Sequence, residues 1–401
     1  TDGRGQVLEG SAHGPFDSTP GPVDQVLDGP AARDTAAMSP SRRNGDALRA
    51  FDAPIPTPQE RRAAGKAHRL GVPRGAHDGW EPAPGRVDAI ELLVESNRTR
   101  LADLVPLRYA RMSSSPFAFL RGSAVVMAHD LAASPSTDLE VRLCGDTHLG
   151  NFGVFASPER RLVFDLNDFD EASPGPFEWD VKRLAASLVV AGRENGFDSV
   201  ATRRAVLEAL AAYREVTYLL DTMRPSYRKR MSRQVGKAQA RNHLRALDRL
   251  TEVVDGRRRI VDDPPLVEHV DGHLADLTAR LTQVLTHYRR SLGADRRALF
   301  DRYRFVDFAR KVVGVGSVGT RCWIALFQGP NGGPLFLQLK EARQSVVSQA
   351  LGAPPARHFG QRVVEGQRML QATSDVLLGW ATDEVDGVHY YVRQLWDAKW
   401  S

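Results

Sequence analysis

The sequence has few cysteines and no long apolar run, and these absences narrow the kinds of protein that it can encode. Only Cys144 and Cys322 occur in 401 residues, and their separation matches no metal-site spacing. No apolar stretch approaches the roughly 20 residues of a membrane-spanning helix. The N-terminus also lacks the charged-then-apolar pattern of a secretory signal. We therefore expect a protein without a membrane span that works in the reducing cytoplasm.

The excess of basic over acidic residues is also small. The net charge of +5 over 401 residues does not indicate nucleic-acid binding. The basic stretch 228–245 is followed by acids at Asp248, Glu252 and Asp255, which favours a solvated helix face over a site for an acidic partner. Hydrophobic residues make up 42% of the chain, which is enough to bury a sizeable core in two lobes.

Periodic patterning begins only after the first 58 residues. Residues 1–58 are rich in Gly, Pro, Ala, Asp and Ser, and this composition predicts a largely disordered segment. Organised sequence starts near Gln59. The patterns of 88–97, 116–131 and 198–220 predict helices of a mainly helical region.

The most informative feature is the segment 144–151, Cys-Gly-Asp-Thr-His-Leu-Gly-Asn, together with the acidic segment 165–171. Residues 140–144 alternate as a half-buried strand does, and Gly145 lets the chain turn, so that Asp146 stands at a strand end. Two strand-like segments, 152–155 and 161–164, then flank a turn and predict a hairpin. That hairpin would bring Asp165 back beside Asn151.

These residue types fit phosphoryl transfer. A phosphotransferase needs one carboxylate that orients and deprotonates a hydroxyl, and an amide oxygen plus a carboxylate that hold Mg²⁺. We assign Asp146 to the first role and Asn151 and Asp165 to the second, with Asp168 as a further metal ligand. Asp146 or Asn151 alone could be an ordinary turn residue, but the whole set favours a site. The remaining acids of the segment are expected to be solvated: Asp170 and Glu171.

The second half of the chain carries a Gly-x-Gly-x-x-Gly pattern at Gly314, Gly316 and Gly319. Such a pattern occurs in dinucleotide-binding domains and in kinases. The former requires a helix to follow, whereas 320–327 is rich in aromatic and β-branched residues and predicts a strand. A turn at 328–334 and a strand with Lys340 come next. Strand, glycine loop, strand, turn and strand with Lys is the layout of a kinase small lobe.

Strand alternation predicts that Lys340 faces the cleft, opposite to Leu337 and Leu339. Lys340 would then hold nucleotide phosphates together with the glycine loop, through Gly314, Gly316, Ser317 and Gly319. A helix predicted over 361–371 carries Glu365, which could pair with Lys340 or be solvated.

The spacing of 144–151 and 165–168 resembles the catalytic and metal-binding segments of aminoglycoside phosphotransferases, which typically read His-Gly-Asp-x-His-x-x-Asn and then Ile-Asp-x-x-Asp. Cys144 stands where those enzymes have His. They also carry an Asp at a helix start that buttresses the catalytic loop, and the resemblance implies this role, or that of a plain N-cap, for Asp180. The helix after it is predicted over 181–192, with Gly192 as its C-cap.

The full run of motifs is similar to a bacterial family grouped as domain of unknown function 2252, which is regarded as kinase-like. The resemblance spans roughly residues 60–400. It rests on several segments: 108–112, 115–122, 144–151, 164–171, 178–183, 313–320, 337–342 and 391–395. It implies an α+β, two-lobed protein kinase-like fold in permuted order. The large helical lobe would be 59–300 and the small β-rich nucleotide-binding lobe 301–401. Family members tend to continue further, so we expect a truncated C-terminus.

These observations favour an ATP- and Mg²⁺-dependent phosphotransferase that acts on a hydroxyl acceptor, with a small molecule favoured over a protein. Arg121 is expected to touch substrate or phosphate. A non-catalytic nucleotide sensor or an AMP-transferring enzyme would use the same scaffold. A metallophosphoesterase is a further alternative, since Asp146-Thr-His148 resembles that family's Asp-x-His. However, its later Gly-Asn-His motif does not occur in the sequence.

Overall fold

The computed structural model describes residues 56–137, 139–159, 161–216, 247, 250–255, 257–270 and 274–395. Contacts divide the chain into two units, Thr1–Gln59 and Glu60–Ser401, and the elements from α3 onward lie in the second. Two predictions, the disordered segment 1–58 and the basic stretch 228–245, fall almost wholly outside the described residues.

The first part of the second unit is helical. Its helices after α2 (Pro58–Gly71) are α3 (Ala89–Asn97), α4 (Val105–Met112), α5 (Pro116–Gly122), α6 (Ala124–Ala132), α7 (Glu178–Glu194) and α8 (Ser199–Val216). The predicted helix over 116–131 is split at Ser123, whose backbone at φ −116 and ψ 34 is not helical. Gly192 is not the predicted C-cap of α7. It lies inside that helix, where an added Cβ would come 2.7 Å from Thr202 Oγ1 of α8, so glycine permits the close packing of the two helices.

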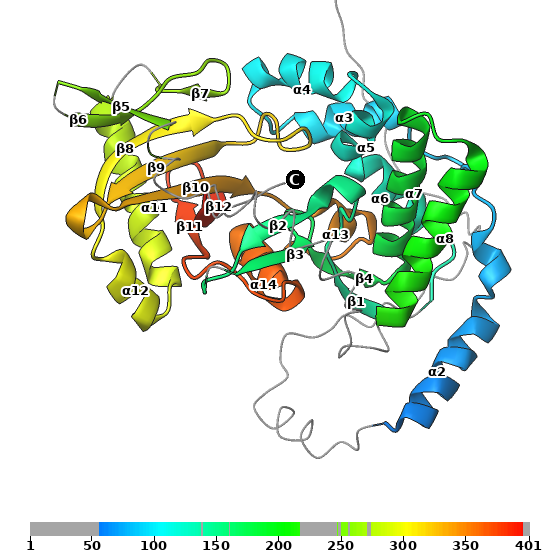
Figure 1. Cartoon of the computed structure of the whole chain (residues 1–401). Helices are drawn as coiled ribbons and strands as arrows, with labels where there is room; N and C mark the ends of the chain where they lie inside the picture. The colour runs from blue at the N-terminus through cyan, green and yellow to red at the C-terminus, as the bar shows by residue number, and fades with distance from the viewer. Residues whose placement is uncertain are drawn as a thin grey trace, which may run out of the picture. The chain divides into compact units, whose positions relative to one another are not determined.

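An antiparallel sheet follows later in the chain (Figure 1, left). Its strands are β7 (Val267–Glu268), β8 (Arg304–Lys311), β9 (Cys322–Gln328), β10 (Pro334–Ala342), β11 (Gly379–Asp383) and β12 (Val388–Gln394). Their spatial order is β11-β12-β10-β9-β8-β7. The strand with Lys340, β10, is therefore central, between β9 and β12.

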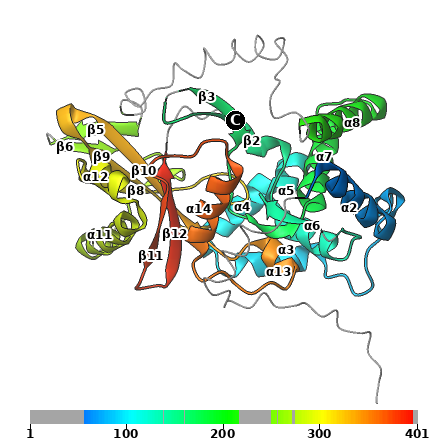
Figure 2. The same ribbon diagram turned by 90° about the horizontal axis from the view of Figure 1, so that it is seen from below.

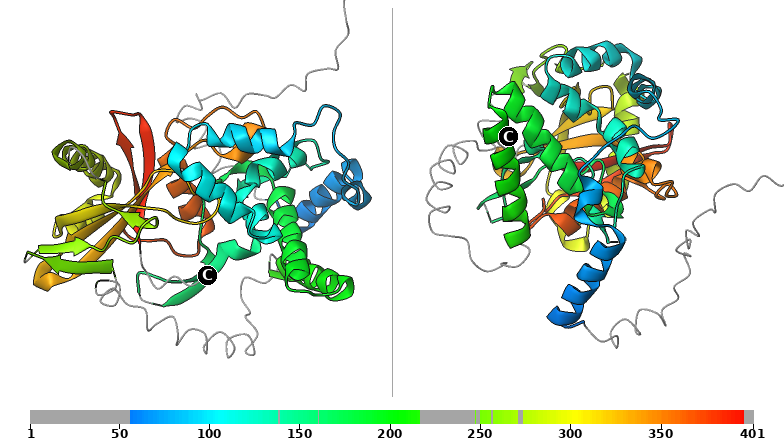
Figure 3. Two further views of the ribbon diagram at one scale, coloured as in Figure 1. Left: turned by 90° about the horizontal axis from the view of Figure 1, so that it is seen from above. Right: turned by 90° about the vertical axis from the view of Figure 1, so that its right-hand side faces the viewer.

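One face of the sheet packs on α11 (Leu274–Ser291) and α12 (Ala294–Phe300), both visible beside the strands in Figure 3. Leu337 and Leu339 of β10 belong to the same buried cluster as Tyr288 and Phe300. Fully burying one such side chain contributes roughly 1.5–3 kcal/mol. The alternation along β10 is as predicted. The helices α11 and α12 lie within the range 59–300 that we predicted as the helical lobe, and they pack on the sheet.

The other face of the sheet meets α14 (Phe359–Leu370), which lies beside β12 (Figure 2), and α13 (Val346–Ala350) follows β10. Val363 and Val364 of α14 are fully buried against Tyr391 of β12 and Phe169. Phe169 belongs to the acidic segment 165–171. The second hydrophobic cluster therefore ties this segment directly to the sheet.

Two-stranded sheets complete a mixed α+β architecture. β1 (Glu140–Leu143) pairs with β4 (Ser173–Pro176), and β2 (Phe152–Ala156) pairs with β3 (Leu162–Leu166) as the predicted hairpin. A second hairpin joins β5 (Thr251–Val254) and β6 (Arg257–Ile260). Among the described residues, no helix combines the length and the apolar character that crossing a membrane requires.

Candidate functional site

Asp146 sits in a turn that is fixed from α7. Gly145 has φ +83, and an added Cβ would collide with the carbonyl of Glu171, so the turn requires glycine. Asp180 in the first turn of α7 accepts hydrogen bonds from Cys144 N at 2.7 Å and from Gly145 N at 2.9 Å. Burial raises the pKa of Asp180, and these two N–H donors oppose that rise. Asp180 therefore supports the turn before Asp146 from the start of α7, as we predicted.

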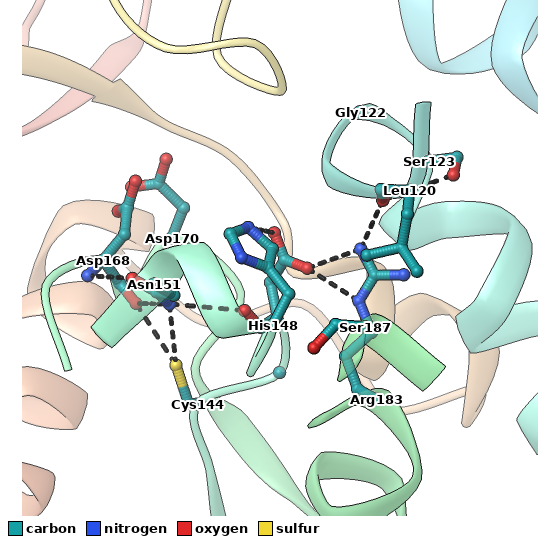
Figure 4. A network of polar contacts seen from close by, with 12 residues as sticks. Leu120, Gly122, Ser123, Cys144, His148, Asn151, Asp168, Asp170, Arg183 and Ser187 are labelled. Carbon is teal, nitrogen blue, oxygen red and sulfur yellow. Dashed lines mark hydrogen bonds and ion pairs between the residues drawn. The ribbon is translucent and has the colours of Figure 1, made fainter. Parts of the chain in front are cut away.

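Arg183, labelled in Figure 4 near Leu120 and His148, lies one helical turn after Asp180 and holds the Asp146 side chain. Its Nε and Nη2 donate to Asp146 Oδ1 at 2.9 and 2.7 Å, and Nη2 also donates to Leu120 O at 2.6 Å. The other oxygen, Oδ2, lies 3.7 Å from His148 Nε2. Burial lowers the pKa of His148. We did not predict Arg183 as a site residue, although its spacing of three from Asp180 puts both on one helix face.

Asn151 joins the Asp146 segment to the acidic segment. Its Nδ2 donates to Asp168 O at 2.9 Å, and its Oδ1 accepts from Asp168 N at 2.8 Å. Both ends of the amide are therefore engaged by the backbone of one residue, and the side chain is buried. Asn151 acts as a clamp that fixes Asp168, and the metal-binding role that we expected for it stays a prediction.

The predicted main metal ligand, Asp165, needs correction. Its Oδ1 accepts from Leu166 N at 2.8 Å and its Oδ2 from Ala372 N at 2.9 Å, so both oxygens bind backbone away from the cavity described below. Asp165 lies on β3 opposite Gly153. The chain continues past the end of this strand, and Asn151 then binds the backbone of Asp168. Asp168 therefore takes the position that we predicted for Asp165.

Lys340 is buried between two carboxylates. Its Nζ lies 3.3 Å from Asp168 Oδ2 and also pairs with Asp170, across 172 and 170 residues of sequence. Burial would lower the pKa of Lys340, but Asp168 and Asp170 raise it well above its ordinary value. Burial and the neighbouring charge of Asp168 raise the pKa of Asp170. Lys340 thus joins the sheet to the acidic segment.

Two further predictions about acids were wrong. Asp170 and Glu171 are not solvated: Asp170 pairs with Lys340, and Glu171 accepts from Val346 N at 2.7 Å. Burial raises the pKa of Glu171 to about 7. Of the two alternatives for Glu365, the solvated one holds, since it is exposed and bonded to Gln361 at 2.7 Å. The buried face of α14 instead presents Arg362, which donates to carbonyls of the acidic segment.

The glycine loop between β8 and β9 reaches the same place. Gly314 and Gly319 have φ of +68 and +85, which glycine adopts readily. Ser317 Oγ lies 3.4 Å from Asp170 Oδ2. From the helical side, Arg111 donates to Gly314 O at 2.7 Å and Arg100 to Val318 O at 2.6 Å. Gly316, which we also predicted, leaves room for the backbone of α5, because its Cβ would lie 3.0 Å from Arg121 O.

These segments surround one cavity of about 270 Å³. Asp146, His148 and Asn151 line it together with the acids Asp168 and Asp170, and Gly314–Ser317 of the glycine loop lines it from the sheet side. Pieces that lie far apart in the sequence therefore form one polar pocket. Lys340 lies beside it, bound to both acids.

The acids at this cavity fit a magnesium ion that arrives with a substrate. Among the described residues, no three His, Cys, Asp or Glu side chains form a group that could hold a metal by itself. Asp170 Oδ1 is buried and makes no hydrogen bond. Mg²⁺ is usually bound through one or two carboxylates plus substrate phosphates. The pair Asp168 and Asp170 offers that donor set.

The chain belongs to the bacterial family described as "uncharacterized protein conserved in bacteria (DUF2252)", whose model matches residues 100–401. No curated protein and no solved structure matches the chain. The matched range contains the whole cavity except Ser96, from Arg100 through Asp146 and the glycine loop to Arg393. The site is therefore a feature of the part of the chain that defines the family.

Proposed function

We propose that the protein is an ATP- and Mg²⁺-dependent phosphotransferase with a two-lobed, kinase-like arrangement in permuted order. The observation that carries the proposal is the cluster of Lys340, Asp168 and Asp170 beside a cavity that the glycine loop and Asp146 also line. A lysine on a strand after a glycine-rich loop, an aspartate for Mg²⁺ and a catalytic-loop aspartate and asparagine are the recurring parts of kinases.

The order of elements supports the same proposal. The glycine loop joins β8 to β9, Lys340 follows on β10, and α14 packs on the sheet before β11 and β12. In kinases these parts precede the catalytic loop, whereas here they follow it. A cut at a different point of the chain is tolerable, because a fold depends on which elements pack together.

Each side chain then has a defined task. Asp146 orients the acceptor hydroxyl with the oxygen that Arg183 leaves open, and takes its proton as the new O–P bond forms and ADP leaves. Asp168 and Asp170 would hold Mg²⁺, with Asn151 fixing Asp168. Bound Mg²⁺ would offset the negative charge of the phosphates. Lys340, which is buried, and the glycine loop bind the phosphates.

A non-catalytic nucleotide sensor is the second candidate. Asp146 is engaged by Arg183, and Lys340 is engaged by two acids rather than by one helix glutamate. Lys340 must therefore exchange an acid for a phosphate before phosphoryl transfer. An AMP-transferring enzyme would use the same scaffold.

The experiment is a thermal-shift titration with ATP, with and without Mg²⁺. A nucleotide that binds only the folded state stabilises that state by mass action, by about 2.7 kcal/mol at a hundredfold excess over Kd. The melting temperature rises as a result. We expect a Mg²⁺-dependent rise in the wild type that Lys340→Ala and Asp168→Asn lose. Asp165→Asn is the matched control and should keep the rise, since Asp165 lies outside the cavity.

Transfer chemistry is then read from labelled ATP. Label that reaches an acceptor from the γ position supports phosphoryl transfer, and label only from the α position supports AMP transfer. Binding without turnover favours the sensor. No Mg²⁺-dependent rise in a folded wild type, or an equal loss in Asp165→Asn and Asp168→Asn, would contradict the proposal.

A further inference from the structure

Arginines gather on the helical side of the cavity. Arg100 follows α3, Arg108 belongs to α4 and Arg121 to α5, and all three line the cavity that Asp146 also lines. Arg343, just after β10 on the sheet side, also lines the cavity and pairs with Glu341. Arg100, Arg108 and Arg121 come from other elements than Lys340 and the two acids proposed for Mg²⁺.

Arg108 is the most buried member, with 2% of its surface exposed. Its Nη1 donates to Asn97 Oδ1 at 2.9 Å and its Nη2 to Gly122 O at 2.7 Å. Both partners are neutral, and Nε has no hydrogen-bond partner among the residues that the structure describes. Burial lowers the pKa of Arg108. A desolvated guanidinium without a carboxylate is costly for the fold unless a ligand supplies the negative charge.

Arg100 resembles Arg108 in that its side-chain hydrogen bonds go to neutral groups. Its Nε donates to Ser96 O at 3.3 Å and its Nη1 to Val318 O at 2.6 Å. Burial and, after it, the charges of Arg108 and Arg343 lower the pKa of Arg100 to about 9, against the opposing charges of Glu171 and Glu341. Like charges at close range disfavour the charged form, and a bound anion would reverse this.

Arg121 connects the arginine cluster with the surroundings of Asp146. Its charge is among the causes that lower the pKa of His148, which lies 3.7 Å from Asp146. Its Nε is buried and makes no hydrogen bond. Its carbonyl faces Gly316, the middle glycine of the loop. Arg121 therefore lies near both His148 and the glycine loop, where we expect an acceptor near Asp146 to bind.

We propose that the acceptor carries an anionic group, a phosphate or a carboxylate, which Arg100, Arg108 and Arg121 bind while its hydroxyl faces Asp146. This inference rests on the proposed function. The planar guanidinium fork matches both anions through paired N–H donors. The anion would restore the missing negative charge and fix the acceptor in register with the base. A neutral acceptor would leave the buried Arg108 uncompensated.

The test is calorimetric titration of inorganic phosphate, and in a second arm acetate, into the full chain saturated with Mg²⁺ and a non-hydrolysable ATP analogue. We expect one of the two anions to bind. Arg121→Gln should weaken that binding at least tenfold, because a charge-assisted contact is lost. Arg100→Gln, a second variant on another element, should do the same. Arg98→Gln is the matched control, since Arg98 is exposed and paired only with Glu95.

Three results would overturn the inference. The first is that neither anion binds while the analogue does, which leaves the proposed function standing. The second is that the anion competes with the analogue and the arginine variants lose the analogue instead, which assigns the cluster to the nucleotide. The third is that an anion binds through these arginines but the analogue never binds. In that case the proposed function fails and the site has no acceptor.

Discussion

At the scale of single residues, the site is held by side chains that bond to the backbone of the segments they organise. Asp180 fixes the turn before Asp146, and Asn151 fixes Asp168. A carboxylate or amide that makes two hydrogen bonds to one stretch of backbone restricts the conformation of that backbone more than a single bond would. Asp146 and Asp168 are thus positioned by residues that hold the backbone around them.

Replacing Asp180 tests this arrangement. Asp180→Asn keeps the size of the side chain but leaves one of the two backbone N–H donors without an acceptor. A buried unsatisfied donor costs about 1–3 kcal/mol, so the free energy of unfolding should fall by about that amount. Urea unfolding followed by circular dichroism measures it.

Asp198→Asn is the control for that measurement. Asp198 is exposed and accepts from Ala201 N at 2.7 Å with one oxygen, which an asparagine also provides. We expect a change within about 0.5 kcal/mol. Equal effects of the two substitutions would contradict the role given to Asp180.

Residue types and spacing predicted several site positions but not all. Asp146 lines the cavity and Lys340 lies beside it, bound to Asp168, as strand ends and strand alternation had indicated. Asp165 was chosen over Asp168 because the length of chain after β3 is not visible in the pattern. Arg183 and Asp170 were missed because their partners come from distant segments, and no local pattern encodes such pairings.

At the scale of elements, the glycine loop and α14 connect the sheet to the helical part. The loop is tied to α4 and to the segment before it through Arg111 and Arg100. His358 is the N-cap residue just before α14, and its Nδ1 accepts a hydrogen bond from Gln361 N at 3.1 Å. Its Nε2 lies 3.0 Å from Thr382 Oγ1, so the cap also joins β11.

This cap makes the α14 region sensitive to acid. Burial, helped by the charge of His389, lowers the pKa of His358 from 6.5 to about 4. The unfolded chain therefore takes up the proton first, and stability present above about pH 6.5 is lost as the pH falls toward 4. His358→Asn keeps a favourable cap without the titrating ring. Between pH 7 and 4.5 it should lose less stability than the wild type by about 1–2 kcal/mol, since partial exposure screens the effect.

Thermal unfolding of both proteins across this pH range measures the difference. His129→Asn provides a comparison, because His129 is an exposed residue of α6. Parallel pH profiles of His358→Asn and the wild type would contradict the assignment.

Elements with a clear period were predicted well, and their packing was not. The strands around the glycine loop occur where alternation and turn residues indicated them. The break at Ser123 was missed because the helical pattern continues across it. The packing of α11 and α12 on the sheet was also missed, since an amphipathic pattern shows that a helix has a buried face but not which element covers it.

At the scale of the molecule, the central claim is that segments separated by about half of the sequence build one nucleotide site. The link is physical: Lys340 bonds to Asp168 across 172 residues, and Phe169 packs in one cluster with α14 and β12. The sequence suggested each half through its motifs. Their meeting depends on long-range packing, which only the structure displays.

Hydrogen–deuterium exchange with Mg²⁺ and ATP tests this claim most directly, because it reports each segment separately. We predict that the nucleotide slows exchange in both 312–321 and 144–171, while the hairpin of β5 and β6 stays unchanged. Protection should require Mg²⁺ and vanish in Lys340→Ala. Protection of one segment without the other, or of neither in a folded wild type, would contradict a shared site.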